Sequence, residues 1–162
     1  DVDRLWYMVS RVFRTILRDP SEAAEMGFPR DTCFDFQSSA RQLERIADHA
    51  TKIADLALEV DAIPESAAEP LRRLMDEAVD VPETAMDALL TDDSDEAVDL
   101  ATEARARIDH VDETVREVDK EIHQFEPQKA QVLGLVVDSL SRTADYGGNI
   151  AESALQKAAP RP

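Results

Sequence analysis

The sequence predicts an all-α protein, on the basis of its composition, its apolar periodicity and the placement of its prolines. Hydrophobic residues make up 43% of the 162 residues, which is enough for a packed core, whereas aromatic residues make up only 5%. With only 4 glycines and many Ala, Leu, Asp and Glu residues, this composition favours helices over β-strands. Apolar residues recur at spacings of three and four, as on one face of a helix, and most prolines stand between these stretches.

The chain divides into five expected helices joined by short connections, a pattern typical of antiparallel helical bundles. The expected helices cover about 3–18, 34–60, 64–90, 94–124 and 127–158. Between the first two, a loop is expected to pass through Gly27, Pro29 and Cys33, with a short turn at about 21–26. Pro82 lies inside the third helix, which it is expected to kink or divide.

The charge of the chain excludes several classes of partner. Asp and Glu number 35 against 18 Lys and Arg, so the formal net charge is −17. Such a surface repels phosphate backbones and anionic lipids, and we expect this segment neither to contact nucleic acid directly nor to insert into a membrane. No apolar run approaches the roughly 20 residues that span a bilayer. The single cysteine excludes an intrachain disulfide and fits a reducing cytoplasm, where we expect the protein to be.

An internal repeat divides the chain into two related halves. Residues 43–58 align without gaps to residues 140–155, and eight positions are identical. Chance similarity between two Ala-rich helices could supply the apolar matches, but it supplies the shared Arg-x-Ala-Asp core much less easily. We expect a first helical half at 1–92 and a second at 93–162, arranged as two tandem antiparallel bundles.

The first copy of the repeat resembles the signature helix of the PhoU family, through Leu43-Glu44-Arg45-Ile46-Ala47-Asp48-His49-Ala50 followed by Ile53-Ala54. The second copy, 141–152, is similar with drift, and so are the turn 95–98 and the Val-Asp pairs at 2–3 and 111–112. The resemblance covers most of the chain. It implies two three-helix bundles related by a pseudo-twofold axis.

The resemblance also implies that this chain lacks the first helix of the family fold, because its own first helix begins inside the second helix of the family. The expected consequence is an apolar groove that is either exposed or filled by another chain. This groove is expected beside Leu5, Met8, Val12 and Ile16.

Carboxylates recur along the first signature helix, where Glu44, Asp48, Thr51 and Asp55 form one polar stripe. The PhoU resemblance implies that the Glu/Asp-x-x-x-Asp pair binds divalent or trivalent metal ions, such as iron, zinc, magnesium or manganese. Carboxylates one turn apart can chelate a hard cation. The alternative is an ordinary solvated face in which Asp48 pairs with Lys52.

The second copy of the repeat keeps only part of this pattern, because Ser141 replaces the first acid of the pair. The candidate metal ligands are Glu44, Asp48 and Asp145, with Asp138, Asp3 and Asp112 as weaker candidates. The repeated arginines, Arg45 and Arg142, are expected to form ion pairs between the two bundles.

The residues favour a binding module over an enzyme. No Glu-x-x-His pattern, Gly-rich phosphate loop or Ser-His-Asp constellation is present, and His49 is interpreted as a satisfied or exposed histidine. By resemblance, the protein regulates phosphate uptake or signalling, with a phosphate ABC transporter ATPase or a sensor kinase as partner and a homodimer as the expected assembly. An upstream DNA-binding domain would make it part of a transcriptional regulator. The competing functions are a metal-binding protein with a carboxylate cluster and a structural oligomerisation bundle.

The acidity itself has two interpretations, a merely acidic soluble protein or one adapted to a high-salt cytoplasm. We favour the halophilic interpretation because only four lysines are present. It predicts that the melting temperature rises steeply from low to molar salt, since at about 1 M salt the screening length falls to roughly 3 Å and self-repulsion is suppressed. Thermal melts over a salt series measure this, and a melting temperature insensitive to salt would contradict it.

Overall fold

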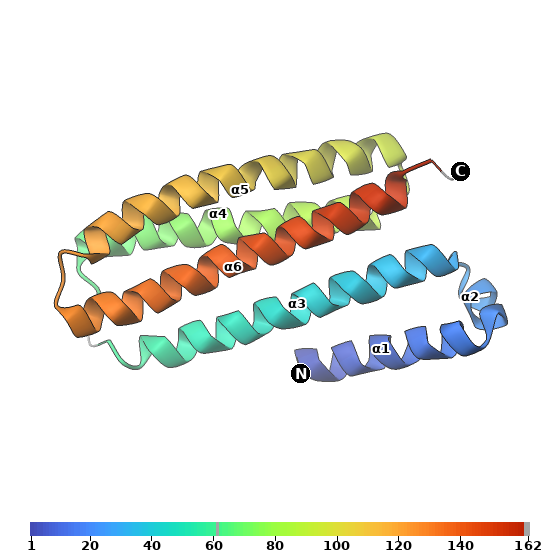
Figure 1. Cartoon of the computed structure of the whole chain (residues 1–162), viewed down its shortest axis with the longest axis horizontal. Helices are drawn as coiled ribbons and strands as arrows, with labels where there is room; N and C mark the ends of the chain where they lie inside the picture. Colours follow the sequence, from blue (N-terminus) through green and yellow to red (C-terminus); the bar gives the residue numbers. More distant parts are fainter. Residues whose placement is uncertain (61, 161–162) are drawn as a thin grey trace.

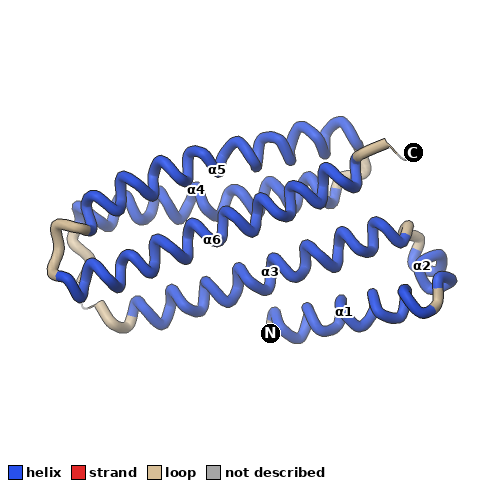
Figure 2. The backbone as a smooth tube through the Cα atoms, viewed as in Figure 1, coloured by secondary structure: helices blue, strands red, loops and turns tan. Residues whose placement is uncertain are grey.

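The computed structural model describes residues 1–60 and 62–160, and within these ranges all regular secondary structure is helical (Figures 1 and 2). The helices are α1 (Val2–Arg18), α2 (Pro20–Met26), α3 (Arg30–Ala57), α4 (Glu65–Leu90), α5 (Ser94–Ile122) and α6 (Pro127–Ala158). The predicted all-α fold is therefore confirmed. None of the helices in the described part of the chain has the length and apolarity that a membrane crossing requires.

The segment between α1 and α3 differs from the expected loop. The carboxylate of Asp19 accepts a hydrogen bond from the backbone N–H of Ser21 at 3.0 Å, which caps a separate short helix, α2. Gly27 ends α2 with φ 76°, the left-handed conformation that glycine adopts most readily. Because α3 begins directly after Pro29, Cys33 lies inside a helix and is buried, contrary to the expected loop position.

Helix α4 runs without interruption through Pro82, so the expected division at this residue does not occur. A proline removes one backbone donor, but packing can hold both flanking segments in line. The flanking residues Ala78, Val81 and Ala85 are fully buried against the neighbouring helices.

The helices form a three-helix bundle of α4, α5 and α6, onto which α3 packs through α6, while α1 packs on α3 (Figure 1). The sequence-based division at 92/93 placed residues 65–90 in the first half. In the structure α4 instead groups with α5 and α6, because its apolar stripe lies in their core. Judged by packing, the boundary between the two halves therefore falls between α3 and α4.

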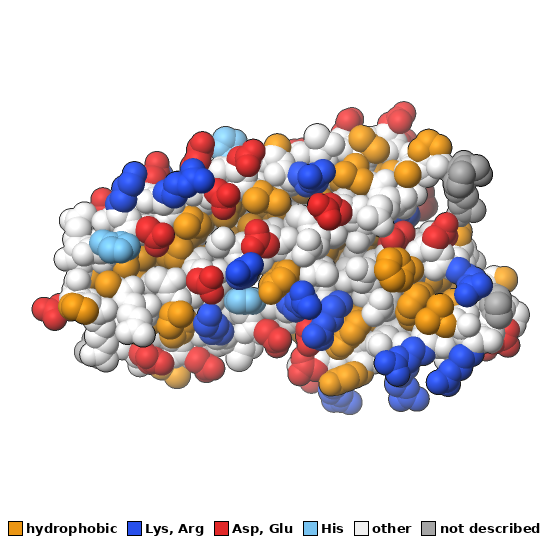
Figure 3. Space-filling model, in the orientation of Figure 1, with side chains coloured by type: hydrophobic (Ala, Val, Ile, Leu, Met, Phe, Trp, Pro, Cys, Tyr) orange, Lys and Arg blue, Asp and Glu red, His pale blue; other side chains and the backbone are white. Residues whose placement is uncertain are grey.

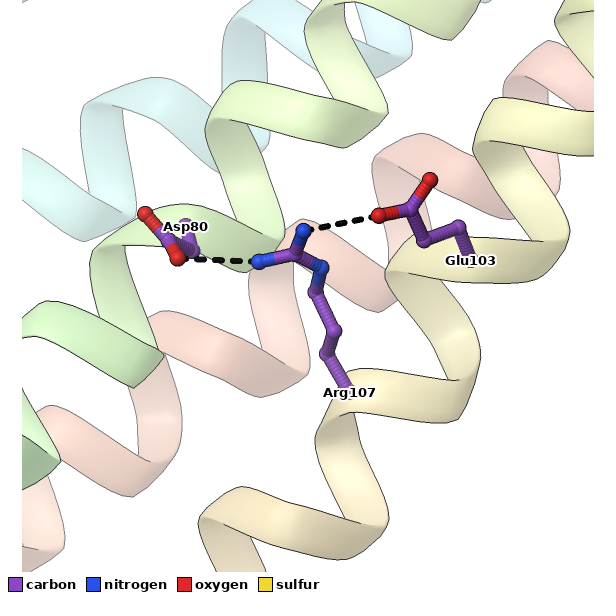
Figure 4. Close-up of polar contacts among 3 residues, drawn as sticks. All are labelled: Asp80, Glu103 and Arg107. Carbon is purple, nitrogen blue, oxygen red and sulfur yellow. Dashed lines mark hydrogen bonds and ion pairs between the residues drawn. The ribbon is translucent and has the colours of Figure 1, made fainter.

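Polar contacts on the surface also join α4 to its neighbours. The guanidinium of Arg107 on α5 donates to Asp80 on α4 at 2.8 Å and to Glu103 on its own helix at 2.7 Å (Figure 4). The hydrogen bond to Glu103 has the largest effect on the pKa of Arg107, and together with the contact to Asp80 it raises that pKa. Lys157 on α6 donates to the backbone carbonyl oxygens of Leu89 and Thr91, each at 2.7 Å, which ties the C-terminal end of α4 to α6.

The expected apolar groove on α1 is present in part. Leu5, Met8 and Val12 are 58%, 57% and 40% exposed. Ile16, by contrast, is 1% exposed, because it packs with Ala23 of α2 and Cys33 of α3 in a small second core.

A close approach between α6 and α4 generates the first structural prediction. A Cβ atom at Gly147 would lie 2.6 Å from the backbone nitrogen and 2.9 Å from the Cα of Pro82, whereas a Cβ at Gly134, also in α6, would meet nothing within 4 Å. We predict that Gly147→Ala lowers the free energy of unfolding by about 1–3 kcal/mol through overpacking. The matched control Gly134→Ala should leave it unchanged or raise it by up to about 1 kcal/mol. Denaturant unfolding measures both, and equal effects would contradict the close contact.

Candidate metal centre

The start of α1 lies against the middle of α3, and this packing brings three carboxylates together. Asp3, in the first turn of α1, meets Glu44 and Asp48, which are one turn apart on α3. One carboxylate oxygen from each residue lies within 4.8 Å of the others. The three acids therefore form a cluster with donors from two helices, which we call the acidic triad.

Two acids of the triad are exposed and the third is largely buried, with one oxygen that lacks a hydrogen-bond partner among the described residues. Asp3 and Asp48 are exposed, whereas the Glu44 side chain is only 12% exposed. Arg41 forms an ion pair with Glu44, with Nη1 2.8 Å from Oε1, but Glu44 Oε2 is buried without a hydrogen-bond partner in the described part of the chain. An unpaired buried carboxylate oxygen costs free energy, so this carboxylate would be stabilised by an additional positively charged or hydrogen-bonding partner.

Two acids of the triad, Asp3 and Asp48, line a groove of about 600 Å³ between α1 and α3. Thr51, Lys52 and Asp55, further along the polar stripe of α3, line the same groove. The alternative interpretation of the stripe paired Asp48 with Lys52. In the structure Lys52 Nζ lies 3.6 Å from Asp138 on α6, so this ammonium group serves the contact between the two halves.

The other candidate ligands are not brought together with the triad. Asp138 is the partner of Lys52, and Asp145 lies 3.4 Å from Arg142 on its own helix. Asp112 is exposed on α5. In the described part of the chain, the second copy of the repeat therefore contributes no comparable group of three acids.

Among the described residues, the two repeated arginines form no ion pair between the bundles, in contrast to the expectation. The guanidinium of Arg45 on α3 lies over the ring of Tyr146 on α6, 5.6 Å from its centroid, while Arg142 pairs with Asp145 within α6. His49 also contacts the Tyr146 ring, at 5.7 Å between centroids, and its buried Nδ1 has no hydrogen-bond partner among the described residues. Contact between the halves at these positions is thus aromatic and cationic, and sequence reasoning missed the part played by Tyr146.

Two further titratable groups, Cys33 and Asp35, lie near the N-terminal end of α3, apart from the triad. Burial raises the pKa of Asp35, and the neighbouring charge of Asp31 adds to the effect. Burial likewise raises the pKa of the Cys33 thiol, which disfavours its thiolate form. Neither group lines the groove beside the triad.

Part of the chain matches a known protein family. Residues 1–57, which comprise α1, α2 and α3, match the family model described as the PhoU domain. This segment contains all three acids of the triad. No curated protein and no solved structure matches the chain significantly.

Proposed function

We propose that this protein is a regulator rather than an enzyme and controls phosphate uptake or signalling through protein–protein contacts, on the basis of the match between residues 1–57 and the PhoU domain model. The proposed partner is a phosphate ABC transporter ATPase or a sensor kinase, in the cytoplasm. A homodimer and a DNA-binding domain joined to this segment, as in a transcriptional regulator, are further parts of the proposal.

The observation that supports this proposal is the extent of the family match, from the start of α1 to the end of α3. Within this segment lies the repeated signature helix, with Arg45 and Asp48. The triad gives it a chemical feature that an inert helical spacer would not need.

We further propose that the triad binds a metal ion. Three carboxylates concentrate negative charge and offer only oxygen donors, which suits hard cations such as magnesium, manganese or ferric iron better than zinc, whose structural sites prefer nitrogen and sulfur ligands. The carboxylate of Glu44, whose Oε2 is buried without a hydrogen-bond partner among the described residues, would be stabilised by a bound cation. A protein whose whole function is such a metal site is the second candidate function.

Metal binding is tested by comparing Asp48→Asn with Asp145→Asn. Both changes replace one aspartate of the repeated signature, but only Asp48 belongs to the triad. A bound ion at free concentration c stabilises the folded state by RT ln(1 + c/Kd), so added manganese or ferric iron should raise the melting temperature of the wild type and of Asp145→Asn. It should raise that of Asp48→Asn far less, with an affinity at least about tenfold weaker. Equal metal responses, or equal metal contents, in the two variants would contradict the proposed site.

The regulatory proposal is tested by binding to purified partners. We expect the wild-type chain to bind the phosphate transporter ATPase or the phosphate-responsive sensor kinase of its own organism in titration calorimetry. An unrelated ABC ATPase serves as the matched control and should not bind. If the chain binds metal but neither partner, the metal-binding function replaces the regulatory one; if it binds neither metal nor partner, a structural oligomerisation bundle remains.

A further inference from the structure

One side of α1 combines exposed arginines with exposed apolar side chains. Helix α1 packs on α3 and on the short α2, and Ile16 is its only buried residue in the described part of the chain. We define the α1 outer face as Arg4, Met8, Arg11, Val12, Arg14 and Arg18, which line one shallow groove along the helix. Figure 3 shows basic side chains gathered over α1, with hydrophobic side chains between them.

The charge of this face is opposite to that of the molecule. Helix α1 contains four arginines and one acid, Asp3, for a net charge of +3, whereas the whole chain carries −17. Among the described residues, Arg11, Arg14 and Arg18 have no ion-pair partner. Arg4 has only a 4.0 Å contact with Asp1, and both side chains are almost fully exposed. A surface of this kind favours a partner that is acidic and apolar at once.

A complementary surface exists on the same chain, on the exposed side of α4. We define the α4 outer face as Met75, Asp76, Val79, Glu83, Asp87 and Leu90, all exposed. At 100° per residue these positions fall within one third of the helix circumference. The three acids have no ion-pair partner in the described part of the chain, although other acids of α4 do.

We propose that the α1 outer face of one copy binds the α4 outer face of a second copy of this chain. Viewed from the N-terminus, the apolar edge of α1 lies clockwise of its basic edge, whereas on α4 the acidic edge lies clockwise of the apolar edge. A parallel pairing of the two helices therefore sets arginines against carboxylates and apolar side chains against apolar side chains.

Other acidic surfaces of the chain fit less well. Helix α4 exposes three large hydrophobic residues on this side, Met75, Val79 and Leu90. In the described part of the chain, α5 exposes only Val98 and α6 only Leu135. Their surfaces can attract arginines but offer little apolar area to bury, and apolar burial is the main source of affinity in stable association.

Charge reversal and charge exchange test this contact. Arg11→Glu/Arg14→Glu reverses the α1 outer face, Glu83→Arg/Asp87→Arg reverses the α4 outer face, and a four-substitution variant exchanges the two. Arg105→Glu/Arg116→Glu, at two exposed arginines of α5 without ion pairs, is the matched control. Sedimentation velocity over a concentration series measures association, at the lowest salt concentration where circular dichroism shows all variants to be folded, because screening of the charges is then least.

We expect the wild type and the control to self-associate and each single-face variant to associate at least about tenfold more weakly. The exchanged variant should recover the affinity, because its charges are again complementary. A monomeric wild type would overturn the proposal, as would equal weakening by the control, or exchange without recovery. If the wild type is monomeric and the α1 variant instead loses binding to the transporter ATPase, the α1 outer face binds a different protein and the self-association proposal is wrong.

Discussion

The packing of α6 against its three neighbours is the constraint on which the rest of the structure depends. At Gly147 the backbone of α6 approaches Pro82 of α4 so closely that no Cβ fits between them, and at Gly148 a Cβ would touch the side chain of Ile108 on α5. On its remaining side, Tyr146 receives Arg45 and His49 of α3. The absence of side chains at two consecutive positions therefore sets the depth at which α6 lies in its bundle, and so the place where α3 can pack.

The geometry of the acidic triad depends on this packing of α6. Helix α6 positions α3, and α3 positions α1, whose first turn then brings Asp3 to Glu44 and Asp48. The second half contains no counterpart of this geometry in the described residues, although it carries the same repeated helix. Ser141 supplies no negative charge there, and the carboxylate of Asp145 forms an ion pair with Arg142. Two copies of one signature thus have different surroundings, because one helix meets α1 while the other is covered by α4 and α5.

The two halves also differ in what they leave uncovered. Helices α4, α5 and α6 bury one another in a shared core against which α3 also packs, whereas α1 contributes only to a small separate core around Ile16. Apolar and basic residues therefore remain exposed on the surface of α1. In a chain with so many carboxylates, an unpaired row of arginines is stable in solution but is strongly complementary to the acidic surfaces of other molecules.

Interactions between residues close in the sequence determine most of the helices, and the sequence alone was enough to predict them. Prolines and capping residues such as Asp19 act within a few residues, and the three-and-four spacing of apolar side chains depends only on helical geometry, so the helices could be located before any packing was known. The pairing of Glu44 with Asp48 follows from the same geometry, because residues four apart share one face of a helix. Only the tertiary structure decided that α4 joins α5 and α6, that Asp3 completes the triad, that Lys52 pairs with Asp138 and that Arg45 lies over Tyr146. Each of these depends on the register between helices distant in the chain, which arises from the fit of whole helix surfaces and leaves no local signal in the residues themselves.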